Sequence, residues 1–298
     1  MFLFPILLLA TAMEVALRHI PNDYTYKKEY LDKNAAAINT LFFGSSHMYY
    51  GVDPKYIAVK SFNASHISQL LYFDYQIFKK YENRLQNLKC VVIPIDYQSL
   101  YGRLETGPER WRVKNYNIYY GINTTNDLTE HYEVLGNKLQ VNLDRLVNYY
   151  GKGITARTCT DLGWGTNFTF KNRQDLEKTG KSAGIRHTVN NDDYFNANLS
   201  ILKAFIKEAN KKNIKIIFVT CPVYKSYVEN MNQAHLKNTI QVATDLASEN
   251  RNVSYYNLLN DNRFVAHDFY DADHLNEFGA EKFSGIVNRL LLAESQKK

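Results

Sequence analysis

The sequence predicts an α/β fold of three layers (α/β/α), with a five-stranded parallel sheet between helices and one large insertion. Five short apolar runs are typical of buried strands, and helical patterns lie between or after most of them. Alternating strands and helices favour a parallel sheet that is covered on both faces. The length of 298 residues, 45% of them hydrophobic, fits one globular domain of this kind with an insertion.

Each predicted strand is a short, mostly apolar stretch. The helical segments instead repeat apolar residues three and four positions apart, most clearly at Leu199, Leu202 and Phe205. The predicted strands cover residues 40–43, 59–62, 90–95, 214–220 and 253–256, and the predicted helices cover residues 67–84, 199–210, 237–248 and 277–292.

The chain begins with an apolar run, MFLFPILLLATAM, of 13 residues. As a helix it would be roughly 20 Å long, which is short of the roughly 30 Å hydrocarbon core of a bilayer. Three interpretations remain open for residues 1–20: a signal peptide, a membrane anchor trimmed at its start, or a buried helix. Export or anchoring is favoured because the run has no polar face, and the α/β domain would then cover residues 36–298.

Regular patterns break between about residues 97 and 192, where Tyr, Asn, Gly and Trp are frequent. This stretch is predicted to be an insertion over one edge of the sheet, with a helix around residues 127–150. Because it follows the strand at 90–95, it starts at the carboxyl edge, where ligands bind in open α/β sheets. The insertion is therefore expected to wall a substrate cleft.

Charge and cysteine content exclude several classes of function. The net charge of +6 comes from scattered Lys and Arg, so nucleic-acid binding is not expected. The three cysteines and the histidines lack metal-ligand spacing, so we expect no metal, no cofactor and no disulfide framework.

Gly44-Ser45-Ser46 follows the first predicted strand directly. A nucleophilic serine needs an exposed Oγ on a sharp turn, with backbone N–H groups free to stabilise an oxyanion. The carboxyl end of a parallel strand offers that geometry, and Gly44 allows a tight turn. The alternative is that the serines cap a short helix.

A second polar cluster, Asp271-Ala272-Asp273-His274, precedes the last predicted helix. Its spacing lets the carboxylate of Asp271 bind one imidazole nitrogen of His274, while the other nitrogen faces a nucleophile. Asp273 and Asp268 are alternatives for this orienting role. The other interpretation is a polar loop whose aspartates cap the helix.

The two clusters together resemble the SGNH (GDSL-like) hydrolases, which have a flavodoxin-like three-layer fold. In that family a G-D-S-like motif follows the first strand, and a D-x-x-H motif precedes the last helix. Here Ser45 stands in place of the usual Asp. The resemblance covers about residues 40–292 without the insertion, and it implies that Ser46 is the nucleophile, His274 the general base and Asp271 its partner.

The resemblance is weaker at the two middle motifs of the family. The stretch SFNASHISQ stands where a glycine N–H would complete the oxyanion hole, so Ser68 and Asn63 are the candidate donors. The third strand ends IPIDYQS, where Asp96 and Tyr97 replace an Asn side chain. Ionised Asp96 would repel an oxyanion. Asp96, Tyr97 and His47 are candidates for lining the pocket. The alternative for His47 is that its side chain packs against the turn that carries Ser46.

The implied activity is that of a serine esterase acting on O-acyl esters, O-acetyl esters in particular, of a carbohydrate. Two alternatives stay open: an O-acyltransferase using the same triad, and a catalytically weak binding or scaffold protein of a surface-glycan pathway. We expect an exported or membrane-anchored protein whose catalytic domain lies outside the cytoplasm and whose N-terminus contacts the membrane. Gly180-Lys181-Ser182-Ala183-Gly184 spells G-x-S-x-G, but no strand is predicted before it, so it is not expected to be a nucleophile turn.

Overall fold

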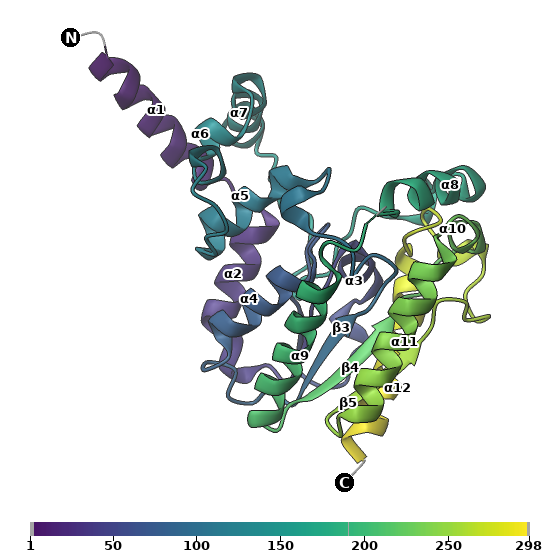
Figure 1. Cartoon of the computed structure of the whole chain (residues 1–298). Coiled ribbons are helices and arrows are strands. Elements are labelled where there is room, and N and C mark those ends of the chain that lie inside the picture. The colour runs from purple at the N-terminus through teal and green to yellow at the C-terminus, as the bar shows by residue number, and fades with distance from the viewer. Residues whose placement is uncertain (1–2, 190, 297–298) are drawn as a thin grey trace. The chain divides into compact units, whose positions relative to one another are not determined.

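A computed structural model describes residues 3–189 and 191–296 and confirms the predicted fold class (Figure 1). Five parallel strands form one sheet in the order β2-β1-β3-β4-β5. Their bounds are β1 Thr40–Phe42, β2 Ser61–Asn63, β3 Cys90–Pro94, β4 Lys215–Thr220 and β5 Val253–Asn257. This order reverses between β1 and β3, and such a switch point is where ligands bind in doubly wound sheets.

The predicted helices are present with shifted ends, and several helices occur where none was predicted. The helices are α1 Leu3–Arg18, α2 Asp23–Asn34, α3 Ser46–Gly51, α4 Leu71–Tyr81, α5 Val113–Asn115, α6 Glu133–Gly136, α7 Leu139–Leu146, α8 Leu176–His187, α9 Phe195–Lys211, α10 Lys225–Glu229, α11 Gln233–Glu249 and α12 Glu277–Gln296. The single helix predicted around residues 127–150 is instead α6 and α7, separated by extended backbone at Asn137.

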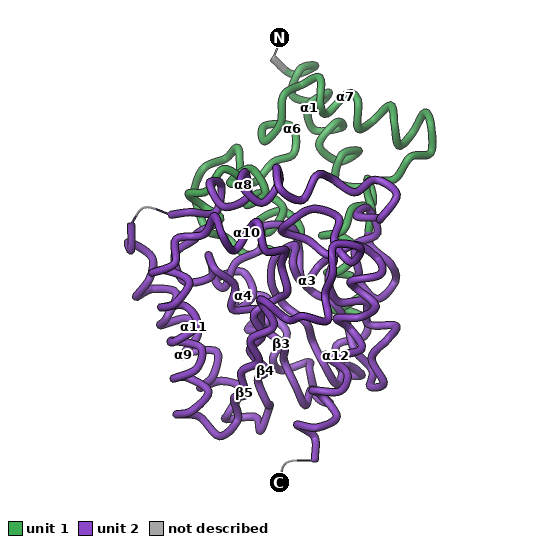
Figure 2. Tube along the Cα trace, turned by 90° about the vertical axis from the view of Figure 1, so that its right-hand side faces the viewer, with its two compact units in different colours: residues 1–33, 104–158 green, residues 34–103, 159–298 purple. Residues whose placement is uncertain are grey.

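The sheet is covered on both faces, which explains the continuous apolar runs of β3 and β4. On one face, Met48 of α3 and Phe283 of α12 belong to the same buried cluster as Phe42 of β1. On the other face, the ring of Phe205 in α9 packs on Phe43, at 5.9 Å between centroids, and on Phe78 of α4. Figure 2 shows α9 and α11 on one side of the strands and α12 on the other.

The chain divides into two compact units, shown in different colours in Figure 2. Unit 1 comprises residues 1–33 and 104–158, and unit 2 comprises residues 34–103 and 159–298. Unit 2 contains the whole sheet and all of the candidate site residues. The segment 159–192, which we expected to belong to the insertion, therefore lies in the same unit as the sheet.

Within unit 1, the second half of the N-terminal helix α1 is bonded to α6. The carboxylate of Glu14 in α1 accepts hydrogen bonds from the Glu133 and Val134 N–H groups at the start of α6, at 3.1 and 2.8 Å. Leu17 is fully buried, whereas the apolar side chains from Phe4 to Leu9 are exposed. Within the described residues, no helix has both the length and the apolarity that a membrane span requires. The first two residues of the N-terminal apolar run lie outside the described residues.

The G-x-S-x-G sequence lies within helix α8 and not on a strand-to-helix turn. A Cβ at Gly180 would lie 2.2 Å from Ser226 Oγ of α10, and one at Gly184 would lie 2.5 Å from Asn230 Cβ. The two glycines, one helical turn apart, therefore let α8 and α10 pack closely. The hydroxyl of Ser182, between them, is exposed and donates to the Thr179 carbonyl at 3.0 Å.

Candidate active site

Ser46 is the first residue of α3 and follows a sharp turn after β1. Gly44 in this turn has a φ of +118°, and a Cβ there would lie 2.2 Å from Pro94 Cγ, so the turn requires glycine. The Gly44 N–H donates to the buried carboxylate of Asp74 at 2.9 Å. Ser45 caps α3 by accepting the His47 N–H at 3.4 Å. The capping role expected as an alternative thus belongs to Ser45, which leaves Ser46 partly exposed.

His274 is held by Asp271 in the tight loop before α12. Its Nδ1 lies 2.9 Å from Asp271 Oδ1 and 3.1 Å from Oδ2. The same Oδ1 accepts the N–H groups of Asp273, at 2.9 Å, and of His274, at 2.8 Å. Backbone N–H groups of the same loop therefore fix the Asp271 carboxylate, which in turn orients the His274 ring. Asp268, the other alternative partner, instead accepts the Val265 N–H and pairs with Lys282.

The structure brings Ser46, His274 and Asp271 together, although they are far apart in sequence. His274 Nε2 lies 2.8 Å from Ser46 Oγ, while Nδ1 faces Asp271. A neutral imidazole in this position carries its proton on Nδ1, donates a hydrogen bond from Nδ1–H to Asp271 and accepts a hydrogen bond from the Ser46 hydroxyl at Nε2. This geometry can activate a serine as a nucleophile.

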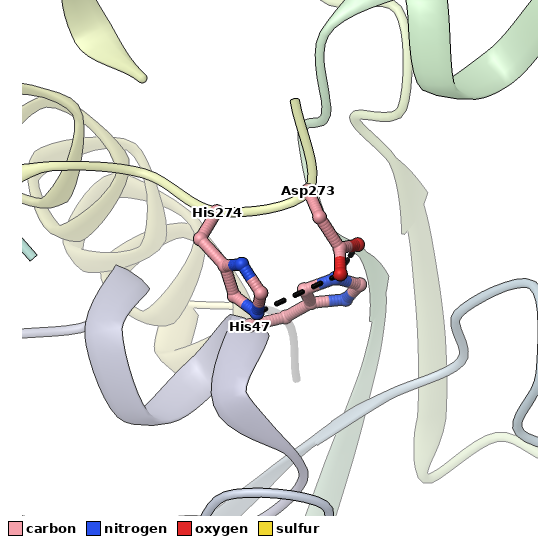
Figure 3. A group of neighbouring side chains, drawn as sticks. All are labelled: His47, Asp273 and His274. Atoms are coloured by element: carbon pink, nitrogen blue, oxygen red, sulfur yellow. Dashed lines mark hydrogen bonds and ion pairs between the residues drawn. The ribbon is translucent and has the colours of Figure 1, made fainter. Parts of the chain in front are cut away.

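His47 lies between two carboxylates beside this group. Its Nδ1 is 2.7 Å from Asp96 Oδ2, and its Nε2 is 2.7 Å from Asp273 Oδ1 (Figure 3 shows the Asp273 side). The three side chains are almost completely buried. Asp273 therefore binds His47, while Asp271 is the partner of His274 Nδ1.

The charges of this buried group shift two pKa values in opposite directions. Burial lowers the pKa of His47, but the carboxylates of Asp96 and Asp273 outweigh it and raise the pKa well above its usual value. Burial raises the pKa of Asp273, but the nearby imidazoles of His187, His274 and His47 outweigh it and hold the pKa well below its usual range. His47 is therefore an imidazolium at neutral pH.

The end of α8 also reaches Asp273. Arg186 Nη2 lies 3.4 Å from Asp273 Oδ2, and the Arg186 Nε–H donates to His187 Nε2 at 3.2 Å. His187 Nδ1 lies 2.6 Å from the hydroxyl of Tyr227. Burial lowers the pKa of His187 to about 4, so this imidazole is neutral at neutral pH.

Three stacked aromatic rings lie against His274. Tyr50 stacks on Phe168 at 3.8 Å between centroids, and Phe168 stacks on Tyr270 at 3.9 Å. The His274 ring meets Phe168 at 5.1 Å and an interplanar angle of 71°. The indole N–H of Trp164 donates to the Tyr50 carbonyl at 2.7 Å, which ties the segment that carries Phe168 to α3.

Two of the secondary candidates, Asn63 and Tyr97, have roles other than those expected. Asn63 is fully buried, and its amide donates to the carbonyls of Met48 and Val52, both at 2.8 Å, so it fastens α3 and is not directed at an oxyanion. The hydroxyl of Tyr97 accepts the Asn232 N–H at 2.9 Å within a buried apolar cluster, so Tyr97 packs the core.

The carboxylate of Asp96, which we expected to repel an oxyanion, accepts the Cys221 N–H at 2.9 Å and pairs with His47. His47 is likewise buried. Ser68 has a φ of +59° and is partly exposed, and among the described residues no hydrogen bond joins it to Ser46. Its role as an oxyanion donor stays a prediction.

Two overlapping groups have the donor types of a metal site, with ligand atoms within 4.8 Å of one another: His47, Asp273 and His274, and His47, Asp96 and Cys221. Both nitrogens of His47 already bind carboxylates, and both nitrogens of His274 bind Asp271 and Ser46. Burial raises the pKa of the Cys221 thiol well above its usual value, which disfavours the thiolate that a metal would need. The arrangement fits a network of shared protons better than a metal site.

The sequence did not indicate the residues that surround the triad: Arg186, Phe168, Tyr270 and Asp74. Arg186 and Phe168 lie in the stretch without clear periodicity. Asp74 lies in the predicted helix at 67–84, where a single carboxylate carries no signal. Only the folded chain places the positive charge of His47 between the negative charges of Asp96 and Asp273.

Residues 163–283 match a family model described as a protein of unknown function (DUF1574), a stretch that includes Asp271 and His274 but not Ser46. No curated protein matches the chain. Three solved structures show a likeness. One is provisionally described as a platelet activating factor from Streptococcus pneumonia (13% identity, 96% of this chain and 98% of that chain, TM-score 0.47).

The second is provisionally described as an acylhydrolase from Bacteroides fragilis NCTC 9343 (10% identity, 90% of this chain and 96% of that chain, TM-score 0.43). The third is a GDSL-like lipase from Bacteroides thetaiotaomicron VPI-5482 (9% identity, 91% of this chain and 99% of that chain, TM-score 0.42). At these values the likenesses do not bear on activity or substrate.

The three-layer, flavodoxin-like fold that the resemblance implies is confirmed by the chain's own geometry. The sheet is parallel with the order β2-β1-β3-β4-β5, as in flavodoxin-like folds. The Gly44-Ser45-Ser46 turn follows β1, and the Asp271–His274 loop precedes α12, as the motifs predict.

Proposed function

We propose that the protein is a serine esterase that acts on O-acyl esters, O-acetyl esters in particular, of a carbohydrate. The observation that carries the proposal is the hydrogen-bonded series Ser46 Oγ, His274 and Asp271, with distances of 2.8 and 2.9 Å. Ser46 is partly exposed at the carboxyl edge of the sheet, where a substrate can reach it. These are the features that activate a serine for acyl transfer.

In the proposed reaction, Ser46 Oγ attacks the ester carbonyl while its proton passes to His274 Nε2. Asp271 stabilises the imidazolium that forms, because its carboxylate accepts a hydrogen bond from Nδ1–H throughout. The imidazolium then protonates the leaving alkoxide, which departs as the sugar hydroxyl and leaves an acyl group on Ser46. Water, deprotonated by His274, then attacks the acyl carbonyl. The bond between the acyl group and Ser46 Oγ breaks, His274 returns the proton to Ser46 Oγ, and the carboxylic acid is released.

The oxyanion of each tetrahedral intermediate needs N–H donors. We assign this role to backbone N–H groups near Ser46 and to that of Ser68, since the side chain of Asn63 is bound elsewhere. The ring stack next to His274 supports a carbohydrate substrate. Tyr270 ends this stack and is partly exposed, and an aromatic ring offers an apolar face with a polar rim to a sugar.

The test is labelling with a fluorophosphonate probe, which reacts with activated serines. We expect wild-type protein to be labelled, and the Ser46→Ala and His274→Ala variants to lose the label. Ser182→Ala is the matched control, because Ser182 is an exposed serine in a G-x-S-x-G sequence outside the site, and this variant should label normally. No labelling of folded wild type would favour a binding or scaffold protein.

Hydrolysis and transfer share the acyl-enzyme and differ in the acceptor. Incubation with p-nitrophenyl acetate, with and without an excess of an unacetylated oligosaccharide, separates them. Acetate as the main product in both cases supports the esterase. Acetylated oligosaccharide as the main product would identify an O-acyltransferase that uses the same residues.

We further propose that α1 contacts a membrane and that the esterase acts outside the cytoplasm. The support is the apolar first half of α1, where Phe4, Leu7 and Leu9 are 71%, 66% and 71% exposed. Exposed apolar groups of this size favour transfer to a hydrocarbon phase. The second half, from Glu14 to Leu17, packs on α6 and would hold the helix to unit 1.

Flotation with vesicles of phosphatidylcholine and phosphatidylglycerol tests this contact on the full chain. Wild type should float with the vesicles, and the double variant Leu7→Asp with Leu8→Asp should not. Ile185→Asp is the matched control, since Ile185 is an apolar side chain of unit 2 that is 70% exposed. Equal flotation of all three proteins would refute a contact through α1.

A further inference from the structure

The reaction proposed for Ser46, His274 and Asp271 makes no use of the buried group formed by Asp96, His47 and Asp273. This group is nevertheless built with short contacts, since both carboxylates lie 2.7 Å from a ring nitrogen of His47. A buried ion pair is costly unless its geometry is good and its remaining polar atoms are bound. Both conditions are met here, since each carboxylate binds His47 and Asp96 also accepts the Cys221 N–H. Such a group is expected to have a role in the protein.

The group joins three elements that converge at the carboxyl edge of the sheet. His47 directly follows Ser46 in α3, Asp96 follows β3, and Asp273 directly precedes His274. Asp96 is fixed at its far side, where Oδ1 accepts the Cys221 N–H at 2.9 Å and its own N–H donates to Ser99 Oγ at 2.9 Å. The His47 ring therefore links a rigid anchor to the residue adjacent to His274.

Asp273 lies close to the atom of His274 that must accept a proton. Its Oδ2 is 3.7 Å from His274 Nε2, whereas Ser46 Oγ is 2.8 Å from the same nitrogen. The longer distance is outside hydrogen-bonding range. A carboxylate free to move by about 1 Å would become the preferred partner of this nitrogen, since a charged acceptor binds more strongly than a hydroxyl.

We propose that His47 is a positioning residue that holds the Asp273 carboxylate away from His274 Nε2 and balances its charge, so that this nitrogen stays available to Ser46. The inference rests on the proposed function, because it assigns His47 a part in preparing the same nucleophile. It also accounts for the Asp at position 96, where the SGNH pattern has an Asn, since Asp96 is the anchor that keeps His47 in place.

Other charged and titratable groups face His47 or Asp273, and none replaces the charge of His47. Arg186 reaches Asp273 from α8 at 3.4 Å, but its side chain is half exposed. His187 lies 3.7 Å from the same oxygen and is neutral, because burial lowers its pKa to about 4. The pKa values of the Cys221 thiol and the Tyr227 hydroxyl are raised by burial, so both groups are neutral.

Loss of the His47 charge would leave the carboxylate of Asp273 free to attract a proton on His274 Nε2. Protonated His274 cannot accept the hydroxyl proton of Ser46. The centroids of the two imidazole rings are 5.5 Å apart. A unit charge at this distance would move the acidic limb of kcat/KM upward by about one to two pH units.

The first experiment compares the pH dependence of kcat/KM for p-nitrophenyl acetate in wild type, His47→Gln and His187→Gln. We expect the acidic limb of His47→Gln to move upward by about one unit or more. His187→Gln is the matched control because it removes a neutral ring near the same oxygen of Asp273, and its limb should stay in place. An unmoved limb in His47→Gln, or an equal shift in both variants, would overturn the proposal.

The second experiment does not depend on turnover. NMR titration of the eight histidines, assigned by single His→Gln variants, follows His47 in the wild-type full chain. We expect both of its nitrogens to remain protonated well above the pH at which an ordinary histidine loses its proton. Titration of His47 as an ordinary histidine overturns the proposal even if His47→Gln does not fold. If wild type neither turns over the ester nor reacts with the fluorophosphonate, the proposed function fails, and this titration still decides whether His47 carries the charge.

Discussion

Replacement of Asp74 by Asn should stabilise the protein at alkaline pH and leave it nearly unchanged in acid. Asp74 lies in the first turn of α4 and is almost fully buried. Its Oδ1 accepts the Gly44 N–H at 2.9 Å and the Gln69 amide at 2.6 Å. Burial raises the pKa of Asp74 from 3.8 to about 7, and these two hydrogen bonds lower it only in part.

The size of the effect follows from this shift. A difference of about three pKa units corresponds to about 4 kcal/mol. Because the pKa is higher in the folded than in the unfolded state, the folded state binds the extra proton. The free energy of unfolding of wild type therefore falls as the pH rises from about 4 to about 7, and the whole amount is lost above about pH 7.

The Asn variant keeps an oxygen for both donors and carries no charge. Its gain over wild type should be near zero at about pH 4 and should approach about 4 kcal/mol at about pH 8. Urea unfolding of both proteins at several pH values in this range measures the difference directly. A gain that does not depend on pH, or an Asn variant that is less stable at about pH 8, would refute the reasoning.

Asp74→Ala is the control, because it removes the acceptor along with the charge. It leaves the buried Gly44 N–H without its partner, which should cost about 1–3 kcal/mol even in acid. The comparison of Asn and Ala thus separates the cost of the buried charge from the value of the hydrogen bond to the turn before Ser46.

Three further predictions concern the site and its supports. Asp271→Asn should lower kcat for p-nitrophenyl acetate by about 10³–10⁴-fold with an unchanged circular dichroism spectrum, since the amide favours the wrong tautomer of His274; a loss below about tenfold would contradict the triad. Gly44→Ala should lower Tm by several degrees or prevent folding, because its Cβ would lie 2.2 Å from Pro94 Cγ at a φ of +118°; a normal Tm would show that the turn can relax. Gly180→Ala should lower Tm, because its Cβ would lie 2.2 Å from Ser226 Oγ. Ser46 should still react with the fluorophosphonate. Loss of this reactivity together with a lower Tm would show that the packing of α8 also supports the site.

Local patterns were sufficient to predict the sheet and most of its helices. The runs that became β3 and β4 are continuous and apolar because both faces of the sheet are covered, and this pattern is visible in a few residues. The helix at α9 was predicted from its stripe of Leu202, Phe205 and Ile206, and it begins four residues earlier than expected. Its first turn, Phe195 to Asn198, has too few apolar residues to show the period.

The segment between residues 97 and 192 shows where local patterns were insufficient. α8 is polar on most of its surface, and its glycines argue against a helix by propensity. Packing on α10 decides the outcome, because only glycine lets the two backbones approach at Gly180 and Gly184. The same tertiary contact carries Arg186 to Asp273, a pairing that nothing in the sequence near either residue indicates.

Short stretches of the chain were enough to predict the order of the five strands, the position of Ser46 after β1, and the spacing that lets Asp271 reach His274. Each of these depends on residues that are near one another in the chain. The folded chain was needed to show that His274 meets Ser46, that the Asn63 amide binds the backbone of α3, and that His47 lies between Asp96 and Asp273. These contacts join residues more than ten positions apart, so they exist only where parallel strands bring their carboxyl ends to one edge of the sheet. The charge and the raised pKa of His47 follow from its contacts with Asp96 and Asp273, and nothing in the sequence around position 47 specifies them.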